Sequence, residues 1–154
     1  MSPELDEKLC KTYPKIFKDR HGDRMQTCMY YGFSCDDGWF NIIDSLCAVL
    51  QNHVENERYR HKELSDEEFD EKFQIVAAQV KEKFGGLRFY IDNHSHFASG
   101  AIAAAESMSL VTCECCGNPG KSKGGGWVRT RCSPCSDKEK VQREEMKQKK
   151  LFVE

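Results

Sequence analysis

The strongest hydrophobic pattern lies over residues 39–54, where apolar side chains recur at spacings of three and four. That spacing places them on one broad face of a helix, which is typical of an amphipathic helix that covers a core. Asp36 or Asp37 precedes the pattern and is expected to cap the helix. The positions that we expect to be largely buried are Trp39, Ile43, Leu46 and Leu50.

A shorter helix is predicted at the start of the chain. Ser2 takes the capping position and Pro3 the first helical position, where the missing N–H of proline costs nothing. Pro14 ends or kinks this helix, because proline cannot continue the hydrogen-bond ladder. Ile16 and Phe17 are then expected to enter the core.

Three more helices are indicated farther along the chain. Ser65 and Glu68 stand three residues apart, which is the capping-box arrangement at a helix start. The charged segment 55–63 before them is expected to fray. Residues 97–110 are rich in alanine and predict a helix packed closely on a sheet. Residues 137–150 predict a charged helix that is exposed over much of its length.

The segment between these helices admits two interpretations. Val76 and Val80 fit a helix that continues, but Gly85 and Gly86 followed by an aromatic-rich run are typical of a hairpin turn and its second strand. A lone strand cannot satisfy its backbone hydrogen-bonding groups, so a partner strand is needed. We therefore predict a β-hairpin at about residues 76–92.

Four cysteines form two C-x-x-C pairs, Cys113 with Cys116 and Cys132 with Cys135, separated by 15 residues. Two thiolates three positions apart in a tight turn can face one ion, and zinc prefers four ligands in a tetrahedron. Disulfides or free thiols are the alternative, but both pairs have ligand spacing. We expect one structural zinc ion, because four thiolates leave no open coordination position.

These patterns together predict an α+β protein. Residues 1–112 form a mainly helical body with the hairpin, and residues 113–154 form a zinc ribbon followed by the charged helix. Glycines between the two cysteine pairs predict a flexible loop that leads into a short strand. No low-complexity linker separates the two parts, so we expect the ribbon to be docked on the body.

Charge is distributed unevenly along the chain, whose formal net charge is −2. Residues 113–154 hold ten basic and six acidic residues, a net charge of +4, so residues 1–112 carry −6. Basic residues interleaved with aromatic ones could bind nucleic acid or an acidic protein face. A hairpin that hides its aromatics and exposes its charges explains part of the pattern equally well. The candidate binding residues are Lys121, Lys123, Trp127, Arg129, Arg131 and Arg88.

A candidate cleft would bring together His21, Cys28, Cys35 and Arg88 as an enzyme active site or a nucleotide-sequestering pocket. The segment 28–35 is predicted as either a short strand or a packed loop. Buried thiols in an aromatic cluster beside a surface histidine are the simpler interpretation. The sequence contains no Walker A, G-x-S-x-G or H-E-x-x-H motif, and no histidine stands between the cysteine pairs as in HNH nucleases.

The sequence also bears on location. No charged segment followed by an apolar run stands at its start, and no apolar run approaches the roughly 20 residues that span a bilayer. Nine cysteines without a secretion signal favour a reducing compartment. We therefore expect a cytoplasmic protein that has no membrane partner.

Three motifs resemble small zinc-ribbon proteins encoded by bacteriophages and prophages. They are residues 32–39 (GFSCDDGW), residues 81–90 (KEKFGGLRFY) and residues 113–120 (CECCGNPG), together with Trp127 and Cys132. The resemblance spans about Met25 to Cys135. The last ligand in that group is often histidine, where this chain has Cys135, an equally good zinc ligand. The resemblance implies a phage accessory protein in the bacterial host cytoplasm and supplies no reaction.

The leading hypothesis is a protein that binds rather than catalyses. It would dock on a host protein and inhibit a defence or transcription system. The alternatives are a nucleic-acid-binding module that uses the basic ribbon, and an enzyme or nucleotide-sequestering protein built around the candidate cleft. The oligomeric state stays open.

Overall fold

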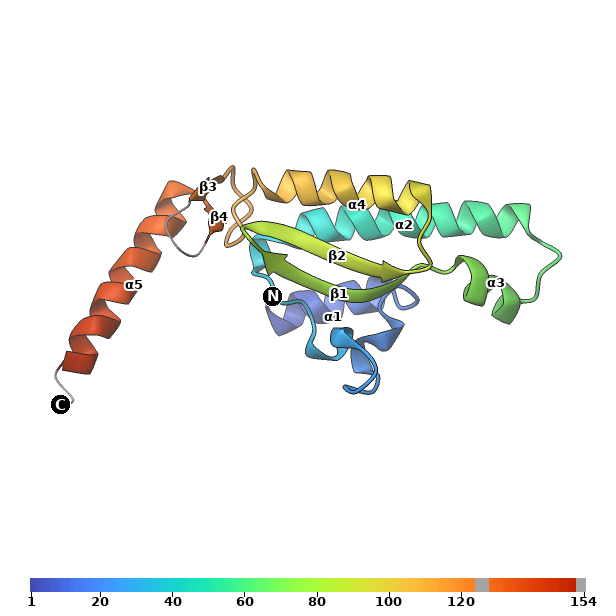
Figure 1. Ribbon diagram of the computed structural model, residues 1–154, viewed down its shortest axis with the longest axis horizontal. Helices are drawn as coiled ribbons and strands as arrows, with labels where there is room; N and C mark the ends of the chain where they lie inside the picture. Colours follow the sequence, from blue (N-terminus) through green and yellow to red (C-terminus); the bar gives the residue numbers. More distant parts are fainter. Residues whose placement is uncertain (124–127, 152–154) are drawn as a thin grey trace.

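The computed structural model describes residues 1–123 and 128–151. Within them the chain has mixed helix and sheet, which confirms the predicted α+β class (Figure 1). The elements are α1 (Pro3–Thr12), α2 (Phe40–Arg60), α3 (Asp66–Phe73), β1 (Val76–Lys83), β2 (Gly86–Asp92), α4 (His96–Ser109), β3 (Lys121–Lys123), β4 (Arg129–Arg131) and α5 (Ser133–Leu151). Single 3₁₀ turns cover Lys18–His21, Cys28–Tyr31 and Asp37–Trp39. Figure 1 shows α2 and α4 side by side along the hairpin, with α5 leading away from the body.

The hairpin forms where the sequence predicts it. β1 and β2 are antiparallel, with Val80 opposite Phe89 and one register irregularity near Ala77. Phe84 and Gly85 both have positive φ, of 54° and 78°, which is the backbone of a tight two-residue hairpin turn. Gly86 already belongs to β2, so the turn lies one residue earlier than the glycine pair indicated.

The long helix differs from its prediction at both ends. It begins at Phe40 after a 3₁₀ turn, and neither Asp36 nor Asp37 caps it with its side chain. The predicted fraying of residues 55–63 is wrong, because α2 continues to Arg60. Arg58 explains the extension: its guanidinium donates to the carbonyl oxygens of His61 and Leu64 and so ties down the last turn.

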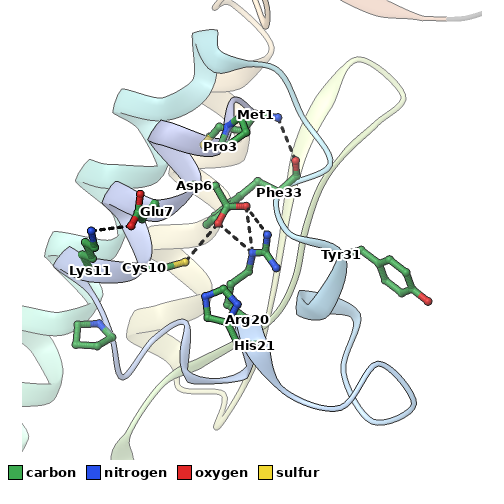
Figure 2. Close-up of a pocket in the computed structure, with 11 residues that line it drawn as sticks. Met1, Pro3, Asp6, Glu7, Cys10, Lys11, Arg20, His21, Tyr31 and Phe33 are labelled. Carbon is green, nitrogen blue, oxygen red and sulfur yellow. Dashed lines mark hydrogen bonds and ion pairs between the residues drawn. The ribbon is translucent and has the colours of Figure 1, made fainter.

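A partly buried ion pair holds the N-terminal helix against the segment that follows it (Figure 2). The guanidinium of Arg20 contacts the Asp6 carboxylate at 3.0 Å and also donates to the Tyr30 carbonyl at 2.9 Å. These contacts of Arg20 fix the path of residues 13–33. Segment 28–35 is a packed loop with one 3₁₀ turn. An isolated bridge from Ser34 to Lys81 joins its backbone to the hairpin.

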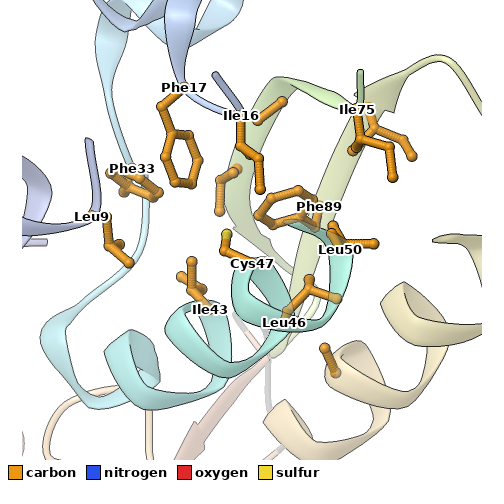
Figure 3. Packing of buried hydrophobic residues seen from close by; sticks show 14 of the residues in the cluster. Leu9, Ile16, Phe17, Phe33, Ile43, Leu46, Cys47, Leu50, Ile75 and Phe89 are labelled. Carbon is orange, nitrogen blue, oxygen red and sulfur yellow. The ribbon is translucent and has the colours of Figure 1, made fainter. Parts of the chain in front are cut away.

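The core lies between α1, α2 and the hairpin, as Figure 3 shows. The four inward positions predicted for the long helix are all confirmed as buried: Trp39, Ile43, Leu46 and Leu50. Ile16 and Phe17 also enter the core as predicted, and Phe17 meets Phe33 edge to face with ring centres 5.0 Å apart. The capping box of Ser65 and Glu68 is present.

The alanine-rich helix is only partly packed. In α4, Ala98 and Ala105 are buried against the hairpin and α2, whereas Ala103 and Ala104 are exposed. The expectation of close packing on the sheet therefore holds for one side of the helix. The opposite side faces outward.

Candidate metal centre

The four predicted cysteines come together at one point. Their sulfur atoms all lie within 4.8 Å of one another, and the Sγ atoms of Cys116 and Cys132 are 3.6 Å apart. Cys113 and Cys116 lie in the turn after α4, Cys132 follows β4, and Cys135 lies in the first turn of α5. Four thiols converging at this range can hold one metal ion in a tetrahedral shell.

The backbone around the first cysteine pair, Cys113 and Cys116, forms a turn that favours metal binding. The Gly117 N–H donates to the Cys113 carbonyl at 2.9 Å, and Gly117 has a φ of 77°, which glycine adopts without strain. Burial alone would raise the pKa of the Cys113 thiol. Backbone N–H groups of Cys132, Cys116 and Cys115 donate to its sulfur and lower that pKa to about 7. Metals bind the thiolate, so this turn favours the ligating form of Cys113, whereas hydrogen bonds from the neighbouring sulfurs raise the pKa of Cys135.

Of the second pair, Cys132 directly follows β4 and Cys135 lies in the first turn of α5. α5 begins at Ser133, four residues before the predicted start, and Pro134 occupies an early helical position, where proline is favoured. The Ser136 N–H donates to the Cys132 carbonyl at 3.0 Å and closes the first turn around the cysteine pair. The metal ligands therefore include the first turn of α5, so a bound ion would fix where this helix starts.

A close backbone contact joins the cysteine turn to the start of α2. The Gly38 N–H donates to the Glu114 carbonyl at 2.7 Å, and the indole N–H of buried Trp39 donates to the Thr112 carbonyl at 2.9 Å. A Cβ atom on Gly38 would collide with the carbonyl oxygens of Cys113 and Glu114. Only glycine fits here, because both colliding groups are backbone.

The second strand of the ribbon contacts the body at two further points. Thr130 is fully buried, and its hydroxyl donates to the Gly85 carbonyl in the hairpin turn at 2.6 Å. The Arg131 guanidinium, whose side chain is 10% exposed, pairs with Asp36 at 2.9 Å. Together with the Gly38 contact, these form what we call the junction: Asp36, Gly38, Trp39, Gly85, Glu114, Thr130 and Arg131.

Glu114 is the buried acid of the junction. Its carboxylate accepts from the Asp36 N–H at 3.2 Å, and its own N–H donates to the Thr130 carbonyl at 3.0 Å. Burial, with the nearby charge of Asp36, raises the pKa of this carboxyl above its usual range. Arg131 lies 3.9 Å away and offsets part of that cost.

Three of the predicted binding residues have acidic partners within the chain. Arg131 pairs with Asp36, Arg129 with Glu139 at 2.7 Å, and Arg88 with Glu106 at 3.6 Å. Lys121 is exposed, and Lys123 ends the short strand β3. Trp127 lies outside the described residues. The guanidinium groups that were expected to bind a ligand therefore contribute to internal contacts.

The residues of the candidate cleft lie in different surroundings. His21 lines a pocket of about 710 Å³ beside α1, together with Cys10, Arg20 and Tyr31 (Figure 2). Cys35 instead lines a smaller pocket with Asp36, Glu82 and Arg131, and Cys28 is exposed. Burial raises the pKa of Cys35 to about 12, and burial with the Asp6 carboxylate raises that of Cys10 to about 12. Both thiols are protonated near neutral pH, which is unfavourable for a nucleophile.

Sequence reasoning missed Gly38, Glu114 and Thr130 as residues of the site. The set of three motifs pointed toward Gly38 and Glu114, because residues 32–39, 81–90 and 113–120 all reach the junction, whereas Thr130 lies in none of the motifs. Among the helices that the structure describes, none has the length and apolar character needed to cross a bilayer. Comparison of the chain with family models, with curated proteins and with solved structures finds no match.

Proposed function

We propose that this chain is a zinc-ribbon protein that works by binding another protein rather than by catalysis. The observation that carries the proposal is the convergence of Cys113, Cys116, Cys132 and Cys135 within 4.8 Å, at the start of a helix that leads away from the body. Four thiolates fill a tetrahedral shell and leave no position for a substrate. The ion would therefore be structural.

Zinc is the metal that the ligand set favours. An all-thiolate tetrahedron suits zinc or iron, and zinc is the usual ion of paired C-x-x-C ribbons. Bound at this point, the ion would link the turn after α4 to the first turn of α5. It would thereby fix the direction in which α5 leaves the body.

The part of the chain suited to meet a partner is α5 with the ribbon. Residues 113–154 carry +4, and α5 exposes Val141 and Met146 among charged side chains. A basic helix with a few exposed apolar groups fits an acidic protein surface with apolar contacts at its centre. The resemblance to phage-encoded proteins supports a host protein as that partner.

Nucleic acid is the second candidate, because a +4 segment also attracts phosphate. The internal pairing of Arg129 and Arg131 weakens this alternative, because a phosphate would have to displace Glu139 or Asp36. The acidic body, with its charge of −6, adds repulsion. Docking on a protein therefore ranks first.

The test is affinity capture from bacterial lysate with the tagged, zinc-loaded chain, compared with Cys132→Ser and with Lys147→Glu/Lys149→Glu in α5. We expect one stoichiometric protein that both variants lose, while Cys115→Ser, beside the ligands but outside the set, retains it. Capture that is the same with all variants would contradict the proposal.

A gel-shift assay separates the two candidates. At near-physiological salt we expect no tight complex with single- or double-stranded DNA or RNA. A sub-micromolar complex that Arg129→Glu abolishes would place the nucleic-acid function first.

A further inference from the structure

The outward side of α4 exposes small and apolar side chains. We define the α4 face as Phe97, Gly100, Ala103, Ala104, Ser107 and Met108, all of which are exposed. Phe97 and Met108 are 47% and 55% exposed, with small residues between them. None of the six side chains carries a charge.

The neighbouring helix extends this uncharged surface. α2 packs beside α4, where His53 stacks on Phe97 with ring centres 4.2 Å apart, and Val49 of α2 is 45% exposed. Residues 41–54 and 96–109 together hold only two Asp, Glu, Lys or Arg residues, although 31% of the chain is charged. Asp44 accepts from the Tyr13 hydroxyl, and Glu106 accepts from the Phe89 N–H, so both are engaged with the body.

Gly100 is the second unusual feature of this face. Glycine inside an exposed helix is unfavourable relative to alanine, because it loses more backbone freedom on folding. A Cβ atom on Gly100 would meet nothing within 4 Å inside the chain. Packing within one copy therefore gives no reason for glycine here, whereas close approach of a second backbone does.

We propose that the α4 face is a self-association surface, on which the α4 helix of a second copy packs antiparallel about a two-fold axis. In such an interface each surface meets its own copy, so charged positions near the axis would meet like charges. A face without charge avoids that repulsion, on a body that otherwise carries −6. The small residues let the two backbones approach closely.

The order of side chains along α4 fits this symmetry. Gly100 and Ser107 are equidistant from the midpoint between Ala103 and Ala104, so an axis there places Gly100 opposite Ser107 of the second copy. Phe97 then lies beside Met108 of the second copy, where sulfur and aromatic ring attract each other. Large residues at both ends would enclose a close-packed centre. α5 and the ribbon stay outside this contact, so the inference does not depend on the proposed function.

The first measurement is the mass of the zinc-loaded full chain by sedimentation equilibrium, from low micromolar to hundreds of micromolar. We expect twice the chain mass of 17.7 kDa at the upper end. Gly100→Glu should weaken self-association by about 100-fold, because it buries an unpaired carboxylate at the centre of the interface. Thr12→Glu places the same charge at an exposed position of α1 and should leave the dimer unchanged.

A second pair of variants tests the register. Gly100→Glu/Ser107→Lys would place opposite charges across the axis twice and should recover much of the lost association, whereas Gly100→Glu/Ser107→Glu should not. Circular dichroism of dilute samples should show the same fold for all variants, since Gly100 and Ser107 are exposed. A chain that is monomeric throughout, a dimer indifferent to Gly100→Glu, or absence of rescue would overturn the proposal. So would a monomer whose α4 face binds a different protein.

Discussion

The body and the ribbon are stabilised by different means. In the body, large apolar side chains such as Leu9, Ile16 and Leu50 are fully buried, so the hydrophobic effect supplies most of the driving force. In the described part of the ribbon the buried residues are two thiols, a threonine and an acid: Cys113, Cys132, Thr130 and Glu114. Burial of apolar side chains can hold the shape of the body, whereas the ribbon would rely on a metal ion at its four cysteines and on contacts with the body.

The junction shows how the weaker region depends on the stronger one. Trp39 belongs to the core of the body, yet its indole N–H bonds the last carbonyl before the cysteine turn. The Gly85 carbonyl in the hairpin turn accepts from Thr130. The body thus supplies the rigid surface that a small segment with little apolar core lacks.

Loss of one cysteine ligand should produce the largest difference between the two regions, because it should affect the ribbon and leave the body folded. Cys132→Ser should abolish metal binding, because apparent zinc-binding free energies of about 10–16 kcal/mol are shared among four thiolates. Elemental analysis should give one zinc per wild-type chain and almost none for the variant. Hydrogen exchange should accelerate in residues 113–135 and remain slow in α2. Cys115→Ser is the matched control and should retain the metal, because the exposed Cys115 lies outside the cluster. Collapse of the whole body in Cys132→Ser would contradict the division.

Removing core volume should affect the body instead. Leu46 is 4% exposed on the inner side of α2, so Leu46→Ala should lower the free energy of unfolding by about 2–5 kcal/mol. Chemical denaturation monitored by the far-ultraviolet signal measures this. Zinc content of the folded variant should stay at one per chain, because the ligands do not touch Leu46. A loss under about half a kilocalorie would be too small for a buried leucine.

A substitution at the junction should disturb the contact between the body and the ribbon, while the core of the body and the four cysteines stay unchanged. Gly38→Ala places a methyl group against two backbone carbonyls, which cannot rotate away, and should cost about 1–3 kcal/mol. We expect zinc to remain bound, and Trp39 fluorescence to shift as its bond to Thr112 loosens. Gly22→Ala is the control at another glycine, where the nearest atoms leave more room. Equal stability of Gly38→Ala and wild type would show that the regions are joined elsewhere.

The four-cysteine cluster and the helices could be predicted from the sequence because their determinants are local. The cysteine spacing, the capping box at Ser65 and the period of α2 each involve residues a few positions apart. The junction could not be predicted, because Gly38 meets Glu114 through backbone atoms across 76 positions and leaves no periodic signal. The end of α2 was missed for a related reason: Arg58 bonds carbonyl groups beyond the helix, which residue type alone does not reveal.

The alanine-rich helix shows another difference between sequence and structure. It is small enough for a crowded core and a good helix former on a surface, so an alanine-rich segment predicts a helix without saying which side is covered. Ala98 and Ala104 illustrate the two outcomes within one helix. The basic residues posed a similar problem: Arg129 looked available for a ligand because its acidic partner, Glu139, stands ten positions later on α5.

The smallest effect on stability is expected at Gly100, where a substitution should stabilise the chain rather than destabilise it. Gly100→Ala adds a methyl group in open space within an exposed helix, so it should stabilise the dilute monomer by about 0.5–1 kcal/mol. Chemical denaturation at the lowest workable concentration gives this value without a contribution from self-association. At high concentration the same methyl group stands where the second helix is proposed to approach, and the gain should shrink or reverse. Gly38→Ala and Gly100→Ala thus form a pair in which one substitution destabilises and the other stabilises. A destabilised Gly100→Ala monomer would mean that this side of α4 is packed within a single copy.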